Sequence, residues 1–158
     1  MKPIPTAMVY CLRESHVLLL RRAKEPMKGL WVAPGGKIGP GESPWQCAHR
    51  ELQEETGLHA HDLTLRGIVT ETSPRPDWQW LIFIYVALET SGQMIEQSAA
   101  GELAWVKTAR MTSMDLPEAD CVFGAKVLDL EAPLYHAHFM FDETKVLRSV
   151  MECPSQGS

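Results

Sequence analysis

The chain carries one stretch that combines glycines with a dense block of charge. It reads Gly36-Lys37-Ile38-Gly39-Pro40-Gly41-Glu42, then seven residues, then Arg50-Glu51-Leu52-Gln53-Glu54-Glu55-Thr56-Gly57-Leu58. Glu51, Glu54 and Glu55 are spaced i, i+3 and i+4, which places them together on one helical surface. Such like charges repel one another unless a divalent cation such as Mg²⁺ binds them, typically together with substrate phosphates. The spacing therefore indicates a magnesium–phosphate site, with a solvent-exposed acidic face as the alternative.

The same stretch carries the signals that begin and end a helix. Ser43 is a good N-cap, and Gln46 three residues later completes a capping box with it. Gly57 suits the position just after the last helical turn. These signals predict a helix over residues 44–56. Three apolar residues recur at helical spacing and are expected to pack in the core, namely Trp45, Ala48 and Leu52.

The full pattern is Gly-x5-Glu-x7-Arg-Glu-aliphatic-x-Glu-Glu-x-Gly-aliphatic, and the chain fills every defined position. At average residue frequencies, a chance match is on the order of one in ten million. This pattern is the Nudix box, so the chain resembles the Nudix hydrolases. The resemblance implies an α+β fold in which helices sandwich a mixed β-sheet. It also implies hydrolysis of a nucleoside diphosphate linked to another group, with Mg²⁺, or Mn²⁺, as the cofactor.

The resemblance assigns a role to each charged residue of the box. Glu54 and Glu55 would be the main metal ligands, and Glu51 would share the metal and take a proton from the attacking water. Arg50 would orient Glu51, and the main-chain carbonyl of Gly36 would add a ligand. These roles agree with the chemistry, because a bound metal lowers the pKa of water until a carboxylate can deprotonate it.

Cations near the box are candidates for binding substrate phosphate. They are Arg22, Lys24 and Lys37. Arg22 and Lys24 follow an apolar strand, so a solvent-exposed strand end is their alternative role. Lys37 directly follows two glycines, which let the backbone approach a ligand closely. Glu42 is expected to stabilise the geometry of the loop and the helix.

Outside the box, the chain is similar to the MutT/MutX branch of the family, which acts on nucleoside triphosphates. The similar segments are residues 75–78, 117–120 and 135–139. The branch implies release of a nucleoside monophosphate and pyrophosphate, with 8-oxo-dGTP among the substrates to consider. In relatives, an acidic residue at the start of the second helix lies in the nucleobase pocket, so Asp120 is the candidate base reader. Its alternative role is to stabilise a helix N-terminus.

Two positions depart from the pattern of relatives. Val32 stands where some oxidised-purine hydrolases carry Asn, which argues against reading of 8-oxoguanine. Ala100 stands where many relatives carry a Glu with a metal or base role, and Glu96 and Glu102 are the alternatives for that role.

Two other functions stay open. An ADP-ribose or nucleotide-sugar pyrophosphatase is suggested by Pro74, which lies near a proline of that branch, and a non-catalytic nucleotide-sensing module would usually have lost box glutamates.

Apolar runs and turn signals divide the rest of the chain into further elements. The predicted strands are residues 4–12, 17–22, 62–70, 78–87, 102–106, 134–141 and 145–150, and a second helix is predicted over residues 116–130. Residues 89–101 are polar and are predicted to form a loop. This order is that of an α+β sandwich. His136 and His138 share a strand face, and we favour a structural role over a metal pair because no third ligand is near in sequence.

Length and composition fit one globular domain. Of 158 residues, 45% are hydrophobic and 22% charged, and we expect a single domain over residues 1–152 with a disordered tail at 153–158. The formal net charge is −5 and no basic stripe is present, which argues against a long nucleic acid as partner. A small-molecule nucleotide is the expected partner. The sequence leaves a monomer and a homodimer equally open.

The sequence also indicates in which cellular compartment the protein is expected. No apolar run reaches the about 18 residues of a membrane span, and residues 1–5 lack the long apolar segment of a signal peptide. The four cysteines are widely spread and show no paired metal spacing. We therefore expect reduced thiols in a cytoplasmic protein.

Overall fold

The computed structural model of this chain describes residues 2–154. Residues 155–158 of the predicted tail lie outside that part. The elements, in chain order, are β1 (Ile4–Arg13), β2 (His16–Arg22), β3 (Trp31–Val32), β4 (Gly35–Lys37), α1 (Pro44–Thr56), β5 (His59–Ala60), β6 (Thr64–Thr72), β7 (Trp80–Ala87), β8 (Thr90–Ser91), β9 (Gln97–Ser98), β10 (Gly101–Lys107), the 3₁₀ helix η1 (Thr108–Ser113), α2 (Glu118–Val127), β11 (Tyr135–Phe141) and β12 (Leu147–Glu152).

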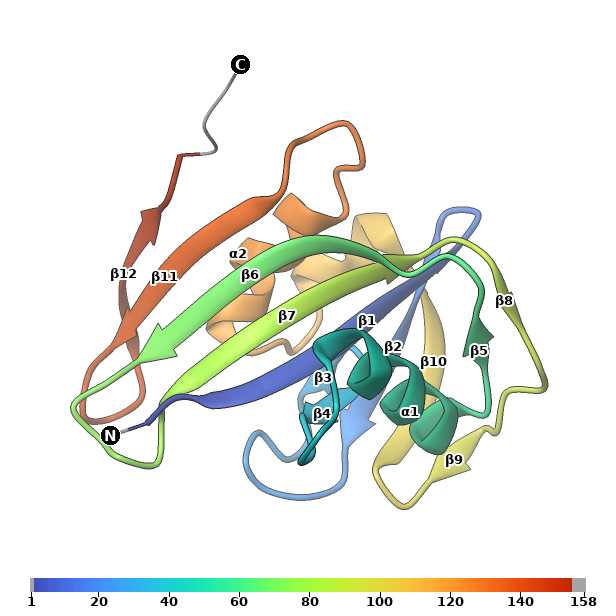
Figure 1. Cartoon of the computed structure of the whole chain (residues 1–158), viewed down its shortest axis with the longest axis horizontal. Helices are drawn as coiled ribbons and strands as arrows, with labels where there is room; N and C mark the ends of the chain where they lie inside the picture. The colour runs from blue at the N-terminus through green and yellow to red at the C-terminus, as the bar shows by residue number, and fades with distance from the viewer. Residues whose placement is uncertain (1, 155–158) are drawn as a thin grey trace.

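Ten of the strands form one sheet, shown in Figure 1, with the order β12-β11-β6-β7-β1-β2-β10-β9. In addition, β3 pairs with β2, and β4 pairs with β1. The β1–β7 and β6–β11 pairs are parallel, and the other pairs are antiparallel. The sheet is therefore mixed, which confirms the predicted α+β class. Strands β1 and β2 form an antiparallel hairpin, with Leu12 opposite Val17.

The sheet separates two hydrophobic cores, one under each helix. Along β1, Val9 and Cys11 join Leu52 of α1 in one core, whereas Tyr10 joins Phe123 of α2 in the other. This follows from the alternation of side chains along a strand. Figure 1 shows α1 and α2 on opposite sides of the sheet. The predicted sandwich of helix, sheet and helix is confirmed.

The predicted ends of α1 are confirmed. The Ser43 hydroxyl accepts from the Gln46 backbone N–H, and the Gln46 side chain accepts from the Ser43 N–H, which completes the capping box. Gly57 ends the helix at φ 81°, a left-handed conformation that glycine adopts without strain. Of the three residues expected in the core, Ala48 and Leu52 are buried, but the prediction for Trp45 is wrong. Its ring packs edge-on against His49 of its own helix and is 53% exposed.

Other element boundaries differ from the predictions. The second helix starts at Glu118 because Pro117 is extended, with φ −56° and ψ 146°, and it ends at Val127 rather than near 130. The strand predicted over 62–70 is β6, Thr64–Thr72, because Asp62 uses its carboxylate to accept the backbone N–H groups of Leu88 and Glu89. The polar segment 89–101 contains the short strands β8 and β9 rather than loop alone.

The structure also describes the cysteines and the two histidines of β11. All four cysteines are free: Cys11, Cys47, Cys121 and Cys153. Within residues 2–154, no helix is long and apolar enough to cross a membrane. His138 Nε2 lies 2.6 Å from the Thr72 hydroxyl, and no third ligand joins His136 and His138 in the part of the chain described here.

Candidate active site

The loop before α1 is fastened to the helix by Arg50 and Glu42. The Arg50 guanidinium donates from Nε to Glu42 Oε2 at 2.7 Å and from Nη2 to Glu42 Oε1 at 2.9 Å. The Gly39 backbone N–H donates to the same Oε1 at 2.9 Å. The hydrogen bonds from Arg50, and then from Gly39, lower the pKa of Glu42 to about 2. Glu42 therefore stays ionised and clamps the loop, as the sequence predicts.

The same guanidinium also holds two box glutamates. Nη1 of Arg50 donates to Glu51 Oε1 at 2.8 Å and to Glu54 Oε2 at 3.2 Å. The Glu51 side chain is 15% exposed and that of Glu54 is 54% exposed. Because arginine presents five N–H donors in a rigid fork, one residue can orient several carboxylates at once.

Glu51 and Glu55 come together beside the two glycines of β4. Gly36 lies directly against the Glu51 carboxylate. Burial, followed by the contact with Glu51, raises the pKa of Glu55 to about 8, while the Gly35 backbone and Arg22 oppose the increase. The thiol of Cys47 donates to the carbonyl of Gly36 at 3.5 Å. The side chains of Glu51 and Glu55 thus meet next to the carbonyl that the sequence predicts to be a ligand.

These oxygen atoms suit a hard divalent cation such as Mg²⁺ or Mn²⁺. A cation at Glu51 and Glu55 would offset the repulsion between their two carboxylates. Glu54 is turned to Arg50 instead, and over residues 2–154 no three His, Cys, Asp or Glu side chains are gathered closely enough to hold a metal. The donor set therefore fits the predicted metal, but not as a preformed cluster of three side chains.

A cavity of about 590 Å³ adjoins the two glycines. Gly35 and Gly36 line its wall, and Gly36 also lies against Glu51, which is not part of the wall. Of the predicted substrate-binding residues, Arg22, Lys37 and Asp120 line the cavity. Lys24 is not part of its wall, and neither are the two candidates for the missing downstream glutamate, Glu96 and Glu102.

The far end of the cavity is apolar and aromatic. Trp78 and Trp80 form its side with their ring centroids 5.9 Å apart in an edge-to-face arrangement, and Phe141 contributes further apolar surface. Such a slot suits a flat heterocycle, because aromatic side chains offer contact area and π-faces to it.

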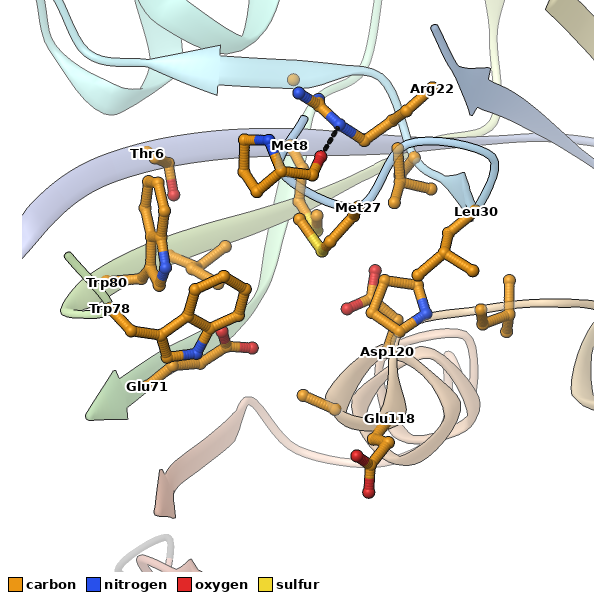
Figure 2. Close-up of a pocket in the computed structure, with 18 of the residues that line it drawn as sticks. Thr6, Met8, Arg22, Met27, Leu30, Glu71, Trp78, Trp80, Glu118 and Asp120 are labelled. Carbon is orange, nitrogen blue, oxygen red and sulfur yellow. Dashed lines mark hydrogen bonds between the residues drawn. The ribbon is translucent and has the colours of Figure 1, made fainter. Parts of the chain in front are cut away.

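Two buried carboxyl groups stand in this apolar end. Figure 2 shows Glu71 reaching in from the sheet and Asp120 from the start of α2. Glu71 is 6% exposed and Asp120 is 7% exposed. Burial raises the pKa of Glu71 to about 7. Burial, followed by the charge of Glu71, raises the pKa of Asp120 well above its usual value.

Sequence reasoning identified Asp120 but missed Glu71 and Trp78. A signal for Glu71 was present, because along β6 it stands two residues after Val69, whose side chain faces the core. A carboxylate at an inward-facing strand position is costly unless a partner or a ligand satisfies it. That cost would have marked Glu71 as a candidate site residue.

Comparison with known proteins identifies the family. The NUDIX domain profile matches residues 2–129. The chain belongs to the Nudix hydrolase family. The Nudix hydrolase YvcI of Bacillus subtilis is 38% identical over 95 residues, covering 58% of this chain and 58% of YvcI. The 8-oxo-dGTP diphosphatase of Proteus vulgaris is 32% identical over 95 residues, covering 60% of this Nudix chain and 83% of that protein.

Solved Nudix structures extend the likeness to the whole fold. The mutator MutT protein from Bacillus halodurans has a TM-score of 0.86 and 29% sequence identity, over 96% of this chain and 99% of that one. The stretch shared with YvcI, by contrast, spans little more than half of YvcI. The predicted resemblance to Nudix hydrolases of the MutT-like branch is confirmed.

Proposed function

We propose that this Nudix chain is a nucleoside triphosphate pyrophosphohydrolase that depends on Mg²⁺ or Mn²⁺. The observation that carries the proposal is the single cavity of about 590 Å³ with two chemically different ends. One end has the glycines of the box together with Arg22 and Lys37, which suits phosphates. The other end has the tryptophan side and Asp120, which suits a nucleobase. A nucleoside triphosphate has both a nucleobase and a chain of phosphates, so it can fill both ends of the cavity.

At the phosphate end, the residues divide the work of hydrolysis. A divalent cation at these carboxylates would neutralise phosphate charge and lower the pKa of water. Glu51 takes the proton of the water that attacks a phosphorus of the α–β bridge, and the bridging P–O bond breaks to release a nucleoside monophosphate and pyrophosphate. Arg50 holds Glu51 at 2.8 Å in the orientation for this transfer. Glu54 and Glu55 supply metal ligands.

At the base end, Asp120 contacts the edge of a purine. Burial raises its pKa, which favours the neutral carboxyl, a form that can donate to a ring nitrogen or a carbonyl oxygen as well as accept. Val32, which is 7% exposed, lies in the cavity wall. It offers no polar group there, so any reading of an oxidised purine such as 8-oxo-dGTP falls to the carboxyl groups.

A hydrolysis screen tests the proposal. The purified protein is incubated with Mg²⁺ or Mn²⁺ and with natural and oxidised NTPs and dNTPs, and both products are measured, with Glu55→Gln as the background control. We expect nucleoside monophosphate and pyrophosphate in equal amounts. Absence of pyrophosphate from every nucleotide would refute the proposal.

Two further arms of the screen cover the other functions. Formation of AMP and ribose phosphate from ADP-ribose, without pyrophosphate release from triphosphates, would assign the chain to the ADP-ribose pyrophosphatases. Tight nucleotide binding without turnover in either metal would indicate a nucleotide-sensing module instead.

A further inference from the structure

The carbonyl oxygen of Lys37 depends on α1 for its hydrogen bonds. Lys37 of β4 pairs with Thr6 of β1, and the next residue, Ile38, donates its backbone N–H to the carbonyl of Pro5. In an antiparallel pair, residues that exchange hydrogen bonds with the partner strand alternate with residues whose N–H and C=O face away from it. The Lys37 carbonyl therefore points away from β1, and its donors have to come from another element.

Cys47 and Arg50 of α1 supply those donors. The Cys47 thiol lies 3.5 Å from the carbonyl oxygen of Gly36 and 3.5 Å from that of Lys37. Nη2 of Arg50 donates to the Lys37 carbonyl at 3.2 Å and to the Cys47 sulfur at 3.7 Å. A thiol is a weak donor, but it is strengthened when its sulfur also accepts, because hydrogen bonds in a chain polarise one another. The sulfur thus joins the loop, the helix and the guanidinium at one point.

The two loop residues held by the thiol face different parts of the site. Lys37 lines the cavity, whereas Gly36 lies directly against the carboxylate of Glu51. Cys47 itself is 0% exposed and is not part of the cavity wall, so it can act only through the main chain of the loop. A shift of that main chain would move the surface against which the Glu51 carboxylate rests.

We propose that Cys47 is a positioning residue, whose thiol holds residues 36 and 37 on α1 and so keeps the carboxylate of Glu51 in place for hydrolysis. The residue lies among the seven positions of the box pattern that are not defined by residue type, between Glu42 and Arg50. The inference rests on the proposed function for its kinetic test, and it adds a residue that supports the proposed base from behind the loop.

Cys47→Ala tests this role, and Cys11→Ala is the matched control. Cys11 is also a free thiol with 0% exposure in the same hydrophobic core, but it lies in β1. Each substitution removes one sulfur atom from that core, so both should lower the stability in urea to a similar extent. Only Cys47→Ala should lower kcat, by at least about fivefold with KM within about twofold, because misplacement of a catalytic group slows the reaction. Equal kcat values in the two variants would overturn the proposal.

Cys47→Ser separates the hydrogen bond from the volume of the side chain. A hydroxyl is a stronger donor than a thiol, but the serine oxygen lies closer to the backbone of α1 than the sulfur does. The loop then has to move towards the helix to keep the bond. We expect a kcat below that of the wild type and at least about threefold above that of Cys47→Ala. Equal kcat values for the serine and alanine variants would show that the thiol only fills space, which contradicts the proposal.

Hydrogen exchange in the metal-free protein gives a readout that does not involve catalysis. The backbone amides of residues 36–42 should exchange at least about threefold faster in Cys47→Ala than in the wild type or Cys11→Ala, because the loop opens more often without the thiol. Unchanged exchange in Cys47→Ala would overturn the role of Cys47 and leave the proposed hydrolysis intact. Faster exchange in a chain that releases pyrophosphate from no nucleotide would refute the hydrolysis and support the hold of Cys47 on the loop.

Discussion

A Cβ atom added to Gly36 would lie 2.4 Å from Oε1 of Glu51, so the glutamate occupies the space that any other side chain at position 36 would need. A real Cβ atom does not approach an oxygen so closely. The loop at Gly36 and the proposed base Glu51 therefore fit together only because position 36 carries no side chain.

The first prediction follows from that contact. Gly36→Ala should displace the Glu51 carboxylate and lower kcat by at least about tenfold, because catalysis is sensitive to displacements of about 1 Å. Gly39→Ala is the control, since a Cβ there would meet its nearest neighbour, Glu42 Oε1, at an ordinary 3.5 Å. Steady-state kinetics on the two folded variants is the measurement, and equal kcat values would show that the contact is unimportant.

The second prediction concerns the Arg50 fork. Lysine keeps the positive charge, but all of its N–H donors are on one nitrogen atom. It therefore cannot bridge Glu42, Glu51 and Glu54 together as the three nitrogens of the guanidinium do. Arg50→Lys should therefore lower kcat by at least about tenfold. Arg75→Lys, which changes an exposed pair with Asp77, should leave kcat within about twofold.

The third prediction concerns the metal ligands. Glu54→Gln and Glu55→Gln should each lower kcat at least about a hundredfold, as loss of a central electrostatic group often does. A chelator should abolish turnover, and added Mg²⁺ or Mn²⁺ should restore it. Gln53→Ala, on an exposed position of the same helix, serves as the control. Near-normal turnover in a Glu variant would remove that residue from the metal site.

The fourth prediction separates the two cations upstream of the box. Arg22→Ala should raise KM for a triphosphate because it removes a positive charge from the cavity wall. Lys24→Ala should leave KM unchanged, since Lys24 lies outside that wall. An unchanged KM in Arg22→Ala would show that Arg22 does not contact the substrate, and a raised KM in Lys24→Ala would contradict the placing of Lys24 outside the site.

The fifth prediction links Glu71 to stability without ligand. Its pKa rises from 4.5 to about 7 on folding, so no stability is lost below pH 4.5, and the folded state becomes progressively less stable as pH increases from there to about 7. Glu71→Gln cannot ionise. The variant should therefore gain up to about 3 kcal/mol over the wild type at pH 8 relative to pH 4.5. Urea unfolding at the two pH values measures this, and an equal difference at both would contradict it.

The sequence correctly predicted the structural features that are set by residues close together in the chain. The box, the Ser43–Gln46 capping box and Gly57 are local patterns, and the structure has the helix that they predict. The long apolar runs likewise predicted the main strands, because burial of both strand faces leaves a continuous apolar signal. The clamp between Glu42 and Arg50 joins residues only eight positions apart.

What the sequence did not predict depends on segments that meet only in the folded chain. Glu71 and Asp120 belong to β6 and α2, and their shared cavity exists because the sheet and the second helix pack together. Trp45 shows the opposite limit. Its spacing is that of a core residue, but no other element covers it.

The division of the interior into two cores has a consequence for evolution of the protein. The box helix packs into the core with Leu52, whereas Trp78 and Phe141 of the cavity wall belong to the other core. A substitution at Trp78 or Phe141 disturbs packing on the α2 side of the sheet, and the helix that carries the proposed metal-binding carboxylates keeps its own support. Such a chain can acquire a new substrate one mutation at a time without first losing its chemistry.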